Sequence, residues 1–127
     1  MSQNAIIWFR RDLRLYDNAA LFHALKDSNQ VFPVFIFDIQ ILSKLKNKKD
    51  RRIEFILRSL AEIKKTLNEN GSDLIVEMGD PELLIPKLIT EYKCNALYIN
   101  RDYEKYAQDR DQTISKILLN KKVTTFA

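Results

Sequence analysis

Two kinds of hydrophobic pattern alternate along the 127-residue chain. Short apolar runs, which predict strands, occupy residues 5–9, 31–37, 74–78, 96–99 and 123–126. Longer segments, in which apolar residues recur every three or four positions as on one face of a helix, lie at about 18–28, 50–70, 81–92 and 104–119. The pattern therefore predicts five strands and four helices in strict alternation.

Local signals mark the ends of several predicted helices. Asp17 stands ahead of the first helix, where its side chain can accept first-turn backbone N–H groups. Gly71 follows the second helix at a position that suits a left-handed cap. Asp80 and Pro81 offer a cap and a first helical residue to the third helix. The buried face of the first helix is expected to contain Ala20, Leu21, Ala24 and Leu25.

The order of these elements predicts the fold class. Strands that alternate with helices are parallel and are joined by right-handed crossovers. We predict an α/β fold, a Rossmann-like doubly wound five-stranded parallel sheet with helices on both faces, formed as one domain by residues 1–127. Ligands of such sheets bind outside the carboxyl ends of the strands. The candidate ligand loops are those after Phe9, Phe37, Gly79 and Ile99.

Composition and charge restrict the cellular setting. The net charge of +4 permits attraction to a polyanion, but it does not define a site. The longest apolar stretch, 31–37, is too short to span a membrane, and the first apolar run lacks a preceding basic region. We therefore expect a cytoplasmic protein without a membrane segment. Cys94 and His23 are the only residues of their types, so no metal site is predicted.

The usual catalytic and phosphate-binding motifs are missing. The loop at 9–14 has no glycine, so its backbone cannot approach a pyrophosphate as the dinucleotide fingerprint requires. No phosphate loop and no nucleophile motif are present, so we predict no catalytic residue in this chain. The basic segment 44–52 has no aromatic residue for base stacking and is interpreted as a solvated loop rather than a nucleic-acid site.

A dense group of charges follows the first strand, at the edge where ligands are expected. Spacing alone leaves two interpretations open, surface ion pairs or a ligand site. Phe35, near the end of the second strand, is similarly either a core residue or a platform for a ligand ring. The charged group consists of Arg10, Arg11, Asp12, Arg14 and Asp17.

The sequence IIWFRRDLRLYDNAAL at 6–21 closely resembles the opening of DNA photolyases and cryptochromes. The similarity covers essentially the whole chain, with two departures in which Tyr16 replaces a frequent histidine and Ala19 replaces a proline. Further matches are Phe35–Asp38, Gln40–Leu42, Arg51 with the helix after it, Gly79–Pro81, Asn100–Glu104 and Arg110–Asp111.

This resemblance implies a two-part flavoprotein, a deoxyribodipyrimidine photolyase that repairs cyclobutane pyrimidine dimers in DNA with blue light and reduced FAD. Residues 1–127 would be its N-terminal α/β domain. The C-terminal helical domain, which binds FAD and damaged DNA in the family, is absent from these residues, so the chain is not expected to be active alone. The surface facing that domain is expected to be unusually apolar or charged, and such a surface can drive self-association.

The family resemblance also implies an antenna pigment, which passes excitation energy to the flavin. Folate-type members have an Asn-Glu pair where this chain has Tyr106 and Ala107. The resemblance therefore favours 8-hydroxy-deazaflavin over methenyltetrahydrofolate. By position, Phe35 would line the pigment ring, Arg51 would donate to it, and Asp102 and Glu104 would accept hydrogen bonds. Three further residues would border the cleft, namely Arg10, Arg11 and Asp38.

Two other interpretations belong to different classes of protein. A cryptochrome-like blue-light photoreceptor has the same domain, and the features that separate it from a photolyase lie mainly in the helical domain. A free-standing nucleotide-binding module, such as a universal stress protein, shares the fold class. The latter is disfavoured because its glycine-rich phosphate segment has no counterpart here.

Overall fold

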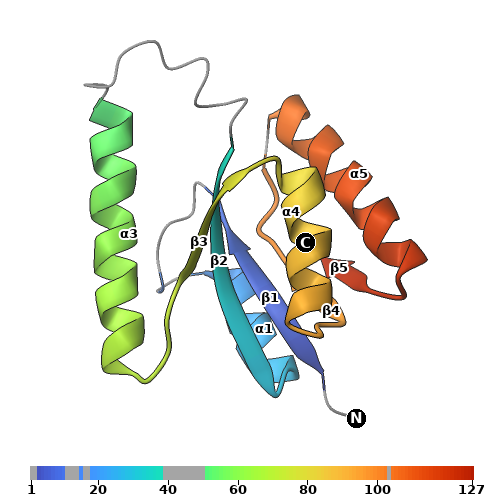
Figure 1. Cartoon of the computed structure of the whole chain (residues 1–127), viewed down its shortest axis with the longest axis horizontal. Helices are drawn as coiled ribbons and strands as arrows, with labels where there is room; N and C mark the ends of the chain where they lie inside the picture. Colours follow the sequence, from blue (N-terminus) through green and yellow to red (C-terminus); the bar gives the residue numbers. More distant parts are fainter. Residues whose placement is uncertain (1–2, 11–14, 16–17, 39–50, 103) are drawn as a thin grey trace.

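A five-stranded parallel sheet forms the centre of the computed structural model, which describes residues 3–10, 15, 18–38, 51–102 and 104–127 (Figure 1). All strand pairs in the sheet are parallel, and their order is β3-β2-β1-β4-β5. Strand order reverses between β1 and β4, so their carboxyl ends form the switch point of this sheet. The strands are β1 (Asn4–Phe9), β2 (Gln30–Asp38), β3 (Ile75–Gly79), β4 (Ala96–Tyr98) and β5 (Thr124–Phe126).

Four described helices cover the sheet in two layers. Residues of α1 and α3 pack in one buried cluster, and residues of α4 and α5 pack in another, on the opposite face. The predicted fold class and the alternation of strands and helices are therefore confirmed, with element ends that differ by one residue at most. The helices are α1 (Ala19–Asp27), α3 (Arg51–Glu69), α4 (Pro81–Glu91) and α5 (Lys105–Asn120).

Strand β1 is buried on both faces because it lies at the middle of the sheet. Successive strand residues point to opposite faces. Accordingly, Ile6 and Trp8 belong to the cluster beneath α4 and α5, whereas Ile7 and Phe9 belong to the cluster beneath α1 and α3. Arg10, the residue after Phe9, thus follows five buried strand residues and lies beside the carboxyl end of β4.

For α1, one of the two expectations is wrong, and the other falls on a residue outside the described part of the chain. The N-cap is Asn18, whose Oδ1 accepts a hydrogen bond from the backbone N–H of Leu21 at 3.1 Å, while Asp17 lies outside the described residues. Leu25 is 60% exposed, although Leu21 and Ala24 are buried. Because each helical residue advances by about 100° around the axis, Leu25 lies beyond the narrow stripe that this short helix buries.

Gly79 allows the chain to pass from β3 into α4 within one residue. Its φ of +154° is a backbone conformation that residues with a Cβ rarely adopt, and an added Cβ would lie 2.9 Å from Cδ1 of Leu84. Asp80 then caps α4 by accepting from the backbone N–H of Glu82 at 2.9 Å, and Pro81 takes the first helical position. The predicted cap and proline are therefore confirmed.

Replacing Gly79 with alanine should lower the free energy of unfolding by about 2–4 kcal/mol, because backbone strain is joined by crowding against Leu84. Gly71→Ala is the matched control, since Gly71 has φ +77° and no atom within 4 Å of an added Cβ. That control should lose only about 1–2 kcal/mol. Urea unfolding measures the free energy of unfolding of both variants. Equal losses of stability would contradict the crowding of an added Cβ against Leu84.

Candidate functional site

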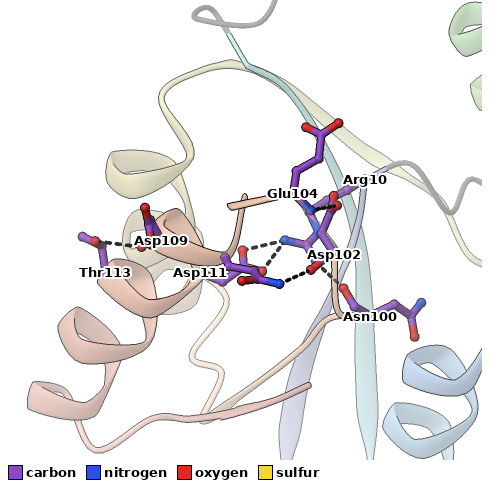
Figure 2. Close-up of polar contacts among 8 residues, drawn as sticks. Arg10, Asn100, Asp102, Glu104, Asp109, Asp111 and Thr113 are labelled. Carbon is purple, nitrogen blue, oxygen red and sulfur yellow. Dashed lines mark hydrogen bonds and ion pairs between the residues drawn. The ribbon is translucent and has the colours of Figure 1, made fainter. Parts of the chain in front are cut away.

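Arg10 forms a buried ion pair at the switch point of the sheet. Its Nη1 donates to both carboxylate oxygens of Asp111 in α5, at 2.5 and 2.7 Å. Its Nη2 donates to the main-chain carbonyl oxygen of Asn100, just after β4. The side chains of Arg10 and Asp111 are only 7% and 15% exposed. One guanidinium therefore connects the end of β1, the loop after β4 and the second turn of α5 (Figure 2).

Two asparagines extend this connection to α1. Asn100 accepts a hydrogen bond from the backbone N–H of Ala20 at 3.0 Å, and its Nδ2 donates to Oδ1 of Asn18 at 2.7 Å. The same Asn18 oxygen caps α1. Four side chains thus join four elements of the fold at one point, and we call them the switch-point cluster: Arg10, Asn18, Asn100 and Asp111.

Trp8 lies beneath the cluster and contacts two cations. The guanidinium carbons of Arg10 and Arg110 lie 5.1 and 5.0 Å from the centre of its ring. Arg110 also lies 5.6 Å from the ring centre of Tyr106 and is 8% exposed. Guanidinium groups are attracted to the face of an indole, more strongly when both are removed from water. This stack therefore adds a second attachment of α5 to β1.

The loop 100–104 brings two carboxylates to the ligand edge. Asp102 Oδ1 accepts a hydrogen bond from the backbone N–H of Glu104 at 3.0 Å, and Nε2 of Gln108 donates to the main-chain oxygen of Asp102 at 3.0 Å. Asp102 is half-buried, whereas Glu104 is exposed, and its carboxylate points away from the Arg10–Asp111 pair (Figure 2). Both acids thus extend from a loop whose backbone is fixed at its beginning and at its end.

The structure separates the predicted site residues into three groups. Arg10 belongs to the switch-point cluster, and Asp102 and Glu104 lie in the loop that this cluster contacts. Asp38 ends β2 and Arg51 begins α3, at the edge where the strands end, and the structure places their backbones only (Figure 1). Arg11 lies outside the described residues, as do residues 44–50 of the basic segment.

Phe35 is a core residue in this structure. Its side chain is 6% exposed, packs in the cluster beneath α1 and α3, and makes an edge contact with Phe37 at 4.9 Å between ring centres. Of the two roles that the sequence left open, the core role is therefore present. A ligand ring at this position would meet a nearly covered phenyl group rather than an open platform.

Asn18, Asn100, Asp111 and Arg110 were not predicted to belong to the site. The partners in the ion pair are 101 positions apart, and no sequence periodicity reports such a contact. One signal was available for Arg110, because it falls at helical spacing with the buried residues Ala107, Ile114 and Leu118 of α5. A charged residue within an apolar stripe indicates a buried partner on a neighbouring element.

Metal chemistry finds no support among the described residues, which contain no group of three His, Cys, Asp or Glu side chains able to hold an ion. Cys94 is buried, and burial raises the pKa of its thiol to about 11, so it packs as an apolar residue. Within the same part of the chain, no helix is both long and apolar enough to cross a membrane.

Fold and site together define a doubly wound α/β domain in which an ion pair lies at the switch point and the exposed Glu104 points away from that pair (Figure 2). The chain belongs to the DNA photolyase family, because the family model matches residues 5–127. It is 36% identical to the deoxyribodipyrimidine photo-lyase of Synechococcus sp. over 93% of this chain and 24% of that protein. It is 35% identical to the blue-light photoreceptor PHR2 of Arabidopsis thaliana, over 77% of this chain and 23% of that one.

A solved structure has the same fold. The archaeal photolyase of Sulfolobus tokodaii, a structure with two FAD molecules, matches with a TM-score of 0.81 and 35% identity, over 96% of this chain and 28% of that chain. The chain therefore spans about a quarter of the length of these relatives. Because the relatives include photolyases and a photoreceptor, family membership leaves both activities open.

Removing the acid of the buried ion pair should strongly destabilise the fold. Asp111→Ala leaves the Arg10 guanidinium buried without its main counter-charge and should lower the free energy of unfolding by about 3–5 kcal/mol. Lys64→Ala is the control, because it breaks an exposed ion pair with Asp73 whose side chains are 50% and 62% exposed. The control should change stability by less than about 1 kcal/mol. Similar losses in denaturant unfolding would contradict the buried pair.

Proposed function

We propose that this chain is the antenna-binding N-terminal α/β domain of a deoxyribodipyrimidine photolyase, which repairs cyclobutane pyrimidine dimers in DNA with blue light and reduced FAD. The observation that carries this proposal is the 36% identity with a photo-lyase over 93% of the chain. FAD and the damaged DNA would be bound by a C-terminal helical domain outside these 127 residues. In this proposal the present chain contributes a pigment site rather than a catalytic residue.

The geometry of the carboxyl edge supports a pigment site there. Ring systems that carry N–H and O–H groups need hydrogen-bond acceptors, and ionised Asp102 and Glu104 provide only acceptors. Arg51, at the start of α3, would donate to a ring oxygen with its planar guanidinium. Asp38 and Arg11 would border the same cleft. Phe35 would present only one edge of its ring to the pigment rather than a face for stacking, because its side chain is 6% exposed.

The proposed pigment is 8-hydroxy-deazaflavin rather than methenyltetrahydrofolate. Ala107 is 4% exposed and lies in the buried stripe of α5, so the second position of the folate-type pair faces the core here. Tyr106 packs against Arg110. The structure of the Sulfolobus relative contains two FAD molecules and implies a novel light-harvesting cofactor. FAD is therefore a second candidate pigment to test.

A cryptochrome-like photoreceptor is the alternative, because the Arabidopsis photoreceptor is almost as similar as the photo-lyase. A free-standing nucleotide-binding module has less support. In that class of fold the ligand enters the crevice between the two central strands at the switch point. In this chain Arg10 and Asp111 occupy that place with their own ion pair.

Exposed apolar side chains support a partner domain. Val76 and Met78 on β3 are 43% and 67% exposed, and Phe55 on α3 is 65% exposed. Other exposed apolar residues lie on α1, α4, α5 and β5, so the described surface offers several sites for such contacts. Association with a helical domain of the same protein, or self-association of the isolated chain, is proposed on this basis.

Light-dependent repair tests the proposed activity. The complete gene product, loaded with FAD and reduced, should restore dimer-containing DNA under blue light and leave it unchanged in the dark. Dimer content is measured by the sensitivity of the DNA to a dimer-specific endonuclease. Flavin binding without repair would contradict the photolyase proposal and favour the photoreceptor.

A substitution in α3 tests the proposed pigment contact. In the complete gene product, Arg51→Ala should reduce bound 8-hydroxy-deazaflavin by about 10-fold or more, while the flavin content stays constant, because a charge-assisted hydrogen bond is lost. Arg58→Ala provides the matched control, since Arg58 is exposed two turns further along the same helix. Equal pigment content in both variants would exclude Arg51 from the site.

A further inference from the structure

We propose that Arg10 and Asp111 are positioning residues for the antenna pigment: their ion pair keeps loop 100–104 in the conformation that presents Asp102 and Glu104. This inference rests on the proposed function, and it assigns Arg10 a different role from the border residue suggested by the family resemblance. The pair would act through the loop and would not itself contact the pigment.

The two ends of the loop depend on the same guanidinium. At the beginning, Arg10 Nη2 binds the carbonyl oxygen of Asn100 directly. At the end, the loop passes into α5, where the backbone N–H of Gln108 donates to the carbonyl oxygen of Glu104 at 3.0 Å. The side chain of Gln108 donates to the main-chain oxygen of Asp102. Asp111 fixes this helix to Nη1 of Arg10. A shift of the guanidinium therefore moves both ends of the loop.

Direct binding of a pigment by Arg10 fits the geometry less well. Nη1 already donates to two carboxylate oxygens, Nη2 donates to a carbonyl, and the side chain is 7% exposed. One face of the guanidinium also lies over Trp8. By contrast, Glu104 is exposed and its carboxylate points away from this pair (Figure 2). The groups that can reach a ligand are thus on the loop, and the groups that fix the loop are beneath it.

Ligand binding is sensitive to such support. A binding group must be held within about 0.5 Å of its productive position by the residues behind it. If the loop relaxes, the hydrogen bonds from the pigment to Asp102 and Glu104 lengthen together. The absorption of a bound chromophore then moves toward that of the free chromophore, because its ring loses the fixed charges and hydrogen bonds around it.

The test compares three variants of the complete gene product with the wild type, using 8-hydroxy-5-deazariboflavin as the probe. Asp111→Asn keeps the size of the side chain and removes its charge. Arg10→Lys keeps the charge, but an ammonium group cannot reproduce the forked contact with Asp111 and Asn100. Ile114→Ala is the control, because Ile114 is 1% exposed one turn further along α5, so the substitution destabilises the helix through a cavity without removing a loop contact.

The measurements are the dissociation constant and the absorption maximum of the bound probe, at a temperature where circular dichroism shows every variant folded. Asp111→Asn and Arg10→Lys should each weaken binding about 10-fold or more and move the maximum toward the free value. Ile114→Ala should bind with the wild-type maximum and within a factor of about two of its affinity.

Unchanged binding in Asp111→Asn and Arg10→Lys would overturn the inference while leaving the antenna function intact. An equal loss in Ile114→Ala would also overturn it, since any loss of stability would then suffice. A wild-type protein that binds none of 8-hydroxy-5-deazariboflavin, methenyltetrahydrofolate and FAD at an antenna site would instead overturn the proposed function, and the inference with it.

Discussion

The ion pair between Arg10 and Asp111 is the constraint on which the carboxyl edge of this sheet depends. Burying a charge is costly unless its partner has excellent geometry. Arg10 follows the buried residues 5–9 of β1, and its side chain is only 7% exposed, so its guanidinium is largely removed from water. Asp111 must therefore lie beside it, which fixes α5 against β1. Through the carbonyl and side chain of Asn100, the same contact fixes the loop after β4 and the start of α1.

This constraint separates the chain from other doubly wound domains. The strand order places the customary ligand crevice between β1 and β4, and dinucleotide-binding folds keep it open with glycines. Here an arginine stands directly after β1, and its ion pair with Asp111 lies at that point. The proposed pigment site accordingly lies on the surrounding loops, where Asp102 and Glu104 would provide acceptors.

Local patterns predicted most of the fold because they report local energetics. Asp80, Pro81 and Gly71 lie at their predicted helix ends, and every strand begins and ends within one residue of its predicted apolar run. The site was less predictable. The charges after β1 allowed either surface pairs or a ligand, and the partner of Arg10 lies in α5, 101 positions away. Asn18 caps α1 and also accepts a hydrogen bond from Asn100, a tertiary contact that no local pattern reports.

A double-mutant cycle on the buried pair tests the central claim most directly. Arg10→Leu, Asp111→Ala and the combined variant would be unfolded in denaturant beside the wild type. If the guanidinium and the carboxylate bind one another as described, the coupling between the two substitutions should reach about 2–3 kcal/mol. A coupling below about 0.5 kcal/mol, the level expected for distant sites, would show that the pair does not organise the carboxyl edge.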